Sequence, residues 1–296
     1  MRWMVLPNMG WLIVALGLVI PGVARADRYD FRLYRLGAPI ADPSANARFE
    51  ALMGELGMAI SNWDLQPAET TGYSGFNFNF EYPVSFINDS GTINGKKYWA
   101  IEGAPNGALQ MPGIHVRKGL PYSFEVGSRV NYIVQSNMVA ATVEAKWALN
   151  EGFLYFPDFA IRGWGTQLIG ARDFNLTTAG LDLSLGKQFA INGQCTLTPY
   201  AGWSSVWTAA SSNVIDFDPG QSEQQQFSGG GASGTNSQDV FQNVSLGQDR
   251  NDRFYAGVRF VGYVVELGLE GSWGIVKTAH TSYTVATYSG TVGLDF

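Results

Sequence analysis

The chain has 296 residues, of which 46% are hydrophobic, 14% aromatic and only 15% charged. Soluble domains carry about 25% charged residues, so this composition fits a soluble enzyme poorly, and a chain this apolar is not disordered. A helical membrane protein is also excluded, because no apolar run after the first 26 residues reaches the roughly 18 residues that a transmembrane helix needs. The mean hydropathy of −0.03 indicates that apolar and polar residues are finely mixed, as they are in a transmembrane β-barrel.

Residues 1–26 have the pattern of a secretory signal peptide. Arg2 is the only charge before the apolar stretch 11–20, which Pro21-Gly22 ends, and Ala24-Arg25-Ala26 fits the small-x-small cleavage rule. The alternative is an amino-terminal membrane anchor, which the shortness of the apolar stretch disfavours. The segment predicts an exported protein.

The charge balance of the predicted mature chain excludes one class of partner. Removing residues 1–26 takes away Arg2 and Arg25 and no acidic residue, so the formal net charge changes from −6 to −8. Nucleic acid is therefore not expected as a partner, because phosphate binding needs clustered basic residues. Cys195 is the single cysteine, which excludes an intramolecular disulfide.

Residues 27–71 differ from the rest of the chain because they carry a helical pattern. Pro43-Ser44 precedes apolar residues at helical spacing, and a short amphipathic helix is expected. Two locations for this segment stay open: packed under the barrel in the periplasm, or entering the lumen as a plug. The apolar face consists of Phe49, Leu52, Met53, Leu56 and Ile60.

The remaining chain, residues 72–296, shows strand-like alternation in ten segments. In the first of them Phe76, Phe78 and Phe80 alternate with Asn77, Asn79 and Glu81. We expect an all-β fold, an antiparallel transmembrane β-barrel of about ten strands, or twelve if Arg28–Tyr34 or Lys97–Glu102 also pair. The ten segments are 75–81, 109–117, 122–132, 139–147, 155–162, 178–185, 196–203, 254–260, 265–273 and 286–296.

The connections support the same architecture. Short turns near residues 119, 151, 192 and 262 fall at every second connection, whereas the long connections 85–108 and 211–251 fall on the other set. Bacterial barrels have short periplasmic turns and longer outer loops. A soluble β-sandwich would also alternate, but its outward face would be the polar one, and here that face carries Phe, Tyr, Trp and Leu.

The last strand resembles that of bacterial outer-membrane β-barrel proteins. Leu294 and Val292 alternate with Asp295 and Thr291, and the chain ends at Phe296. The resemblance implies location in the bacterial (Gram-negative) outer membrane, and recognition of Phe296 by the barrel assembly machinery. Segments 115–121, 157–163 and 196–203 are similar to an uncharacterised group of envelope barrels, a resemblance that implies no function and no site residues.

Charged residues gather on the strand face predicted to line the lumen. An unpaired charge there costs several kcal/mol, so opposite charges are expected to pair across strands. Two interpretations stay open: a salt-bridged, closed interior, or a polar pore whose charges set selectivity. The lumen-facing candidates are His115, Arg117, Glu125, Arg129, Glu144, Lys146, Asp158, Arg162, Asp182, Arg259, Glu266 and Glu270, with Glu81 and Asp295 on the same face.

The sequence does not predict an enzyme. The two histidines, His115 and His280, are expected at opposite ends of the barrel, and neither a cofactor motif nor metal-ligand spacing is present, so no cofactor and no metal site are expected. The leading hypothesis is a porin-like channel or transporter for small solutes, gated by residues 27–71, with the solute undetermined. The alternatives are a non-conducting structural or surface-interaction barrel and, third, an outer-membrane hydrolase.

Overall fold

The computed structural model describes most of the chain after the predicted signal peptide. Residues 1–26 and His280 lie outside the described part, so the interpretation of each stays a prediction. The described residues are 28–101, 107–153, 155–191, 195–217, 238–247, 250–278 and 281–296.

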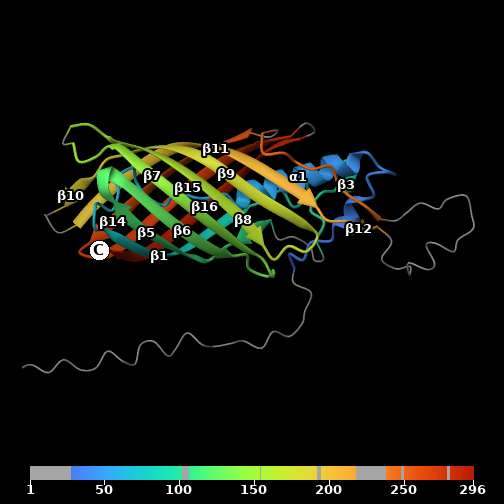
Figure 1. The fold of residues 1–296 in the computed structure, drawn as a ribbon, viewed down its shortest axis with the longest axis horizontal. Helices are drawn as coiled ribbons and strands as arrows, with labels where there is room; N and C mark the ends of the chain where they lie inside the picture. The colour runs from blue at the N-terminus through green and yellow to red at the C-terminus, as the bar shows by residue number, and fades with distance from the viewer. Residues whose placement is uncertain are drawn as a thin grey trace, which may run out of the picture.

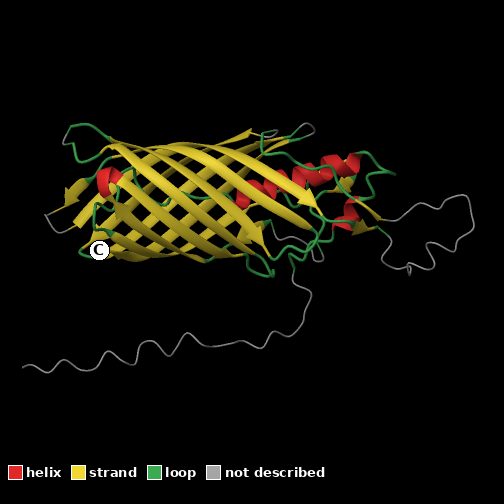
Figure 2. Ribbon diagram, in the orientation of Figure 1, coloured by secondary structure: helices red, strands yellow, loops and turns green. Residues whose placement is uncertain are grey.

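Within the described residues, ten long antiparallel strands close into a barrel, which confirms the predicted fold (Figures 1 and 2). Closure is made by the first and last strands, which pair with each other over the whole stretch from Asn77–Asp295 to Phe86–Ala286. The strands, in barrel order, are β1 (Phe76–Phe86), β5 (Gly113–Leu120), β6 (Phe124–Tyr132), β7 (Val139–Asn150), β8 (Asp158–Ile169), β9 (Phe174–Gly186), β11 (Cys195–Ser212), β14 (Arg250–Gly262), β15 (Val265–Lys277) and β16 (Ser282–Asp295).

The barrel has ten strands, and neither Arg28–Tyr34 nor the described part of Lys97–Glu102 adds a strand to it. The sheet does gain two short strands, but they are β4 (Ala108–Gln110), which pairs with β1, and β10 (Phe189–Ile191), which pairs with β11. Residues 28–34 contribute only an isolated bridge between Phe31 and Ile101. Two small two-stranded sheets lie in the long connections: β2 (Thr92–Ile93) with β3 (Lys96–Lys97), and β12 (Ile215–Asp216) with β13 (Gln238–Asp239).

The alternation in the sequence becomes an apolar outside and a polar inside. In β1, the exposed positions hold Phe76, Phe78 and Phe80, whereas Asn77 and Asn79 are buried. This reverses the pattern of a soluble sheet and is the arrangement of a lipid-facing wall. No helix in the described residues is long and apolar enough to cross a bilayer.

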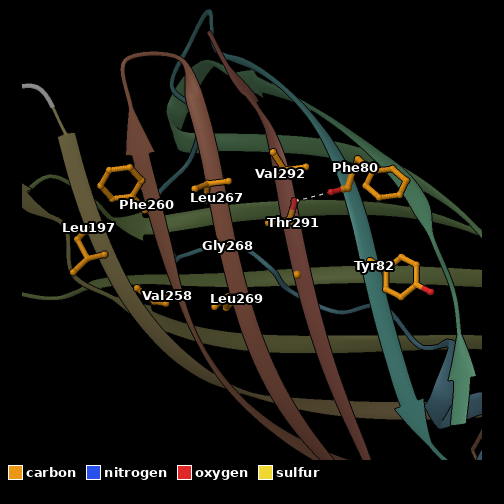
Figure 3. Close-up of a pocket in the computed structure, with 11 residues that line it drawn as sticks. Phe80, Tyr82, Leu197, Val258, Phe260, Leu267, Gly268, Leu269, Thr291 and Val292 are labelled. Atoms are coloured by element: carbon orange, nitrogen blue, oxygen red, sulfur yellow. Dashed lines mark hydrogen bonds between the residues drawn. The ribbon is translucent and has the colours of Figure 1, made fainter. Parts of the chain in front are cut away.

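Figure 3 shows part of this outer wall, where the apolar side chains of five strands surround a groove of about 500 Å³. The groove is lined by Phe80, Tyr82, Leu197, Val258, Phe260, Leu267, Gly268, Leu269, Gly290, Thr291 and Val292.

Glycines on the inner face make room for aromatic rings from the neighbouring strand. Trp164 pairs with Gly180, and a Cβ placed on that glycine would lie 2.3 Å from Cζ2 of the indole. Tyr255 covers Gly202 in the same way, with its Cζ 2.3 Å from the position of a Cβ. Side chains therefore fill the lumen in two ways: some point inward, and others lie sideways over a glycine of the neighbouring strand.

The two ends of the barrel differ. At one end, here called the turn end, short connections join β5 to β6 through the 3-10 turn η3 (Pro121–Ser123) and β14 to β15 through residues 263–264. Phe296 also lies at this end, where its main chain exchanges two hydrogen bonds of 2.9 Å with Phe76. The other end, here called the loop end, carries the two long connections (Figure 1).

The helix α1 (Ser44–Ile60) lies at the loop end and enters the mouth of the barrel (Figures 1 and 2). The sequence predicts one apolar face for this helix, but the structure buries all but three of the helix residues. Gly57 packs on the wall at Thr208, and a Cβ there would lie 2.8 Å from the threonine methyl. On another side Phe49 stacks on Phe241 of a long connection, with 4.9 Å between ring centroids.

After α1 the chain runs through the barrel. Ser61 contacts Arg253 near the loop end, and the Thr71 N–H donates to Glu125 near the turn end, where β1 begins. Residues 61–71, here called the lumen segment, therefore lie inside the barrel. The 3-10 helix η2 (Leu33–Leu36) and α1 lie at the loop end. These two helices are therefore not packed under the barrel at its turn end.

We predict that a charge on the outer wall destabilises the barrel. Leu269 lies near the middle of β15 and is 66% exposed on the outer face. Leu269→Arg is expected to lower the free energy of unfolding in lipid vesicles by about 2–4 kcal/mol, because the side chain faces hydrocarbon. Val240→Arg, at an exposed position in a long connection, is the control and is expected to have little effect. Equal stability of the two variants would contradict a lipid-facing wall.

Candidate functional site

The twelve candidate residues all lie on the inner face of the barrel. None of their side chains is more than 5% exposed. This holds even for Glu144 and Lys146, which lie in the middle of β7. A side chain that lines a water-filled channel would be accessible to solvent. The lumen at these positions is instead filled by protein.

His115 lies between two carboxylates. Its Nδ1 is 2.8 Å from Glu81 Oε1, and its Nε2 is 2.9 Å from Glu144 Oε1. The Nε atom of Arg129 lies 2.7 Å from the second oxygen of Glu81. The strand register explains the cluster, because His115 on β5 is the direct neighbour of Asn79 on β1 and of Arg129 on β6.

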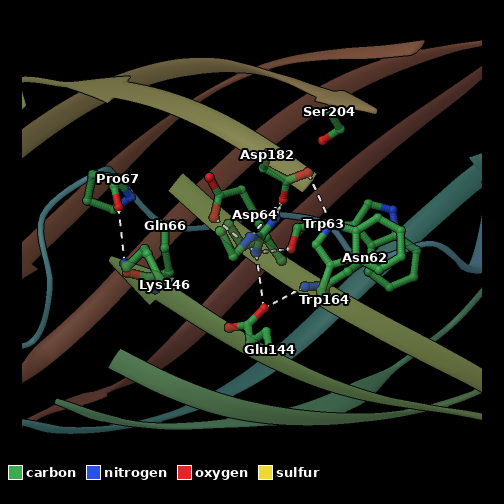
Figure 4. A network of polar contacts seen from close by, with 12 residues as sticks. Asn62, Trp63, Asp64, Gln66, Pro67, Glu144, Lys146, Trp164, Asp182 and Ser204 are labelled. Carbon is green, nitrogen blue, oxygen red and sulfur yellow. Dashed lines mark hydrogen bonds and ion pairs between the residues drawn. The ribbon is translucent and has the colours of Figure 1, made fainter. Parts of the chain in front are cut away.

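Arg162 is the centre of a second cluster, whose members Asp64, Glu144 and Asp182 are labelled in Figure 4. Its Nε donates to Asp182 Oδ2 at 2.7 Å, and its Nη1 lies 3.0 Å from Asp64 Oδ1 and 3.1 Å from Glu144 Oε2. The indole N–H of Trp164 donates to the other oxygen of Asp182 at 3.0 Å. Strands β7, β8 and β9 and the lumen segment thus meet at one guanidinium.

A third cluster lies toward the turn end. Lys146 is 3.0 Å from Glu125, which is also 3.8 Å from Arg117. The amide of Asn77 donates to Glu266 at 2.7 Å, and Arg117 lies 3.9 Å from the same carboxylate. Opposite charges from different strands therefore lie within ion-pair distance of one another, an arrangement that offsets part of the cost of burying them.

Cationic side chains of the wall bind the main-chain carbonyls of the lumen segment. Arg129 and Arg162 donate to the Trp63 carbonyl at 2.9 and 3.0 Å. Arg253 donates to the Asn62 carbonyl, and Lys146 donates to the Glu69 carbonyl at 2.9 Å. These contacts come from four strands, β6, β7, β8 and β14.

Carboxylates of the wall bind the N–H groups of the same segment. Glu270 accepts from the N–H groups of Asp64 at 3.3 Å and of Leu65 at 2.7 Å. Leu65 has a positive φ of 51°, a strained conformation for a leucine, and it turns two successive N–H groups toward one carboxylate. Glu125 accepts from the Thr71 N–H at 2.9 Å.

The sequence missed several residues of this site. Arg253 is buried on the inner face of β14, but the predicted strand began one residue later, and extending its alternation backwards from Tyr255 would have included it. The polar residues of the lumen segment, Asp64 and Glu69 among them, have no periodic pattern. The sequence therefore carried no signal for their partners.

Comparisons with known proteins find similar solved structures but no family. No protein-family model and no curated protein matches the chain. Solved structures that are similar include Neisserial surface protein A (12% identity, 74% of this chain and 95% of that one, TM-score 0.30), Ail, the attachment invasion locus protein of Yersinia pestis (12%, 76% and 100%, 0.26), and the KdgM porin (8%, 74% and 99%, 0.29). By its fold the molecule is an outer-membrane β-barrel, as the strand pairing and the apolar outer wall show.

At the loop end two carboxyl groups have shifted pKa values of opposite sign. The hydrogen bond from Arg48 (2.6 Å) lowers the pKa of Asp42 to about 2. Burial raises the pKa of Glu55 above its ordinary value of 4.5, although this carboxylate accepts hydrogen bonds from the Asn88 N–H and from Trp99 Nε1 at 2.8 Å. We therefore expect the packing of α1 against the long connections to depend on pH.

We predict that removing Arg162 destabilises the barrel far more than removing an exposed arginine. Arg162→Met leaves Asp182 and Asp64 buried without their cation, which is expected to cost about 3–5 kcal/mol. The control is Arg250→Met, which removes a surface pair with Asp252 (3.2 Å) and is expected to cost about 1 kcal/mol or less. Equilibrium unfolding in detergent micelles measures both, and similar losses would contradict a filled, low-dielectric lumen.

We predict that α1 loosens as the pH rises. Glu55 has a raised pKa in the folded state, so its contribution to stability is complete below pH 4.5 and is lost as the pH rises through the raised pKa. The contribution of Asp42 is present above pH 3.8 and is lost only as the pH falls through about 2. Hydrogen exchange of residues 44–60, corrected for intrinsic rates, should therefore increase above pH 4.5, and Glu55→Gln should remove the increase. An unchanged profile in the variant would show that another group is responsible.

Proposed function

We propose that this protein is a sealed barrel of the bacterial outer membrane, which does not conduct and which presents its loop end to the outside as an interaction surface. The observation that carries the proposal is the filled lumen. The lumen segment crosses the barrel from Ser61 to Thr71, and the charged side chains around it are at most 5% exposed.

The orientation follows from the connections. Barrels of this class place short turns in the periplasm and longer loops outside, so the turn end faces the periplasm and the loop end faces the exterior. The exposed residues of 28–60 and of the described parts of the two long connections then belong to the outer surface. Phe296 lies at the periplasmic end of β16 and is 64% exposed, and we propose that the assembly machinery recognises this terminal strand there.

A gated passage for small solutes is the second candidate. It is supported by the polarity of the lumen: the wall around the lumen segment is lined by Arg129, Lys146, Arg162, Arg253 and Glu270 rather than by apolar side chains. A passage left by a displaced segment would therefore be polar and charged, and its solute would be small and hydrophilic.

The proposal includes no catalysis. Both ring nitrogens of His115 lie on buried carboxylates, and the histidine itself is 0% exposed, so it offers no free edge to a substrate. His280, the other histidine, lies outside the described residues.

We predict that the wild-type protein shows no stepwise conductance in planar lipid bilayers. Persistent openings of correctly folded protein, judged by its altered gel migration when unheated, would reject the sealed barrel. Replacing Asn62, Asp64, Gln66 and Glu69 together by alanine removes the side-chain anchors of the lumen segment. Openings in this variant alone would favour the gated passage, whereas a silent variant would favour the sealed barrel.

A further inference from the structure

We propose that the lumen is a binding site for an extended peptide, filled in the intact chain by residues 61–71, and that it holds such a peptide without a covalent link. The inference rests on the filled lumen of the proposed function but not on the absence of conductance.

The wall recognises the main chain of the segment, and not only its side chains. Arg129, Arg162, Arg253 and Lys146 donate to carbonyl groups, whereas Glu270 accepts from two successive N–H groups. Pairing of both main-chain donors and main-chain acceptors is how proteins hold extended peptides. Here the partners are charged side chains from five strands, and charge-assisted hydrogen bonds are stronger than neutral ones.

The side chains of the segment define which peptide fits. Trp63 lies under the guanidinium of Arg129, with 5.7 Å from Cζ to the ring centroid. Asp64 lies 3.0 Å from Arg162, and Gln66 donates to Glu266. The ligand class is thus an extended peptide in which tryptophan is followed by an acidic residue and, two positions later, by an amide.

The site is incomplete without its occupant. The carboxylates of Asp64 and Glu69 pair with Arg162 and Arg259, so an emptied lumen would retain two buried guanidiniums with fewer partners. Buried charges without partners are costly, which favours refilling of the lumen by a peptide of the same chemistry.

The chain offers a place to break the covalent link after folding. Residues 72–74, between the lumen segment and β1, are exposed at the turn end, and Tyr73 is 72% exposed. Gly72 has a positive φ of 79°, and a Cβ there would meet no atom within 4 Å. A protease site inserted between Tyr73 and Ser74 can therefore be cut in the folded, full-length protein.

The first measurement follows the cut protein directly. We expect the amino-terminal fragment to stay with the barrel in detergent micelles, and hydrogen exchange of residues 61–71 to stay at least ten-fold slower than in the free peptide. Exchange as fast as in the free peptide would overturn the proposal even if α1 kept the fragment attached.

The second measurement uses a synthetic peptide of residues 61–71, which lacks α1. The cut chain is unfolded and refolded with an excess of the fluorescent peptide. We expect the peptide to enter the barrel and a scrambled peptide not to, and Glu270→Gln to weaken binding at least ten-fold. Asp252→Asn, which removes an acid of β14 that pairs with the exposed Arg250 (3.2 Å), is the control. Equal uptake of both peptides, or no uptake by refolded barrels, would overturn the inference. An open channel that still takes up the peptide would reject only the proposed function.

Discussion

Burial of charge inside a narrow barrel is the constraint on which the rest of this structure depends. Ten strands enclose a lumen that the side chains of the wall and the lumen segment fill, so each ionised group needs a partner. The wall alone supplies part of this pairing, as in the contacts of His115 with Glu81 and Glu144. The lumen segment supplies the rest through its carboxylates, carbonyls and N–H groups, and barrel and segment therefore depend on each other.

The same constraint separates the molecule into two kinds of interior. The middle of the barrel and its turn end hold ion pairs and hydrogen bonds around the lumen segment, whereas the mouth holds an apolar core of α1, η2 and the long connections. Glycines serve both parts, because Gly57 lets the helix approach the wall and Gly180 leaves room for Trp164. The polar part explains why the segment is extended: a helix inside it would satisfy its own main chain and leave Glu270 and Arg253 without those partners.

A filled lumen changes what the loop end means for function. The segment brings residues 28–60 to the end of the barrel that carries the long connections, so the exposed surface there is made by three parts of the chain that are far apart in sequence. Beneath this surface the three parts are held together by buried aromatic contacts: Phe49 of α1 stacks on Phe241 of a connection, and Phe31 packs edge-on against Phe174 at the start of β9. Under the proposed function, this surface is the part of the molecule that a partner outside the cell would meet.

The sequence by itself determined the ten strands, their inner and outer faces and the chemistry of the lumen, because a two-residue period is local and each strand carries its own copy of it. It could not decide whether the lumen is open, since that depends on how Trp63, Asp64 and their neighbours meet Arg129, Arg162 and Glu270 across more than sixty residues of chain. The lumen segment has no period and no helix signal, so only the tertiary structure placed it inside the barrel. The helix α1 was recognisable because the spacing of its apolar residues is local. Its position at the loop end could not be recognised, because that position depends on contacts between residues far apart in the sequence.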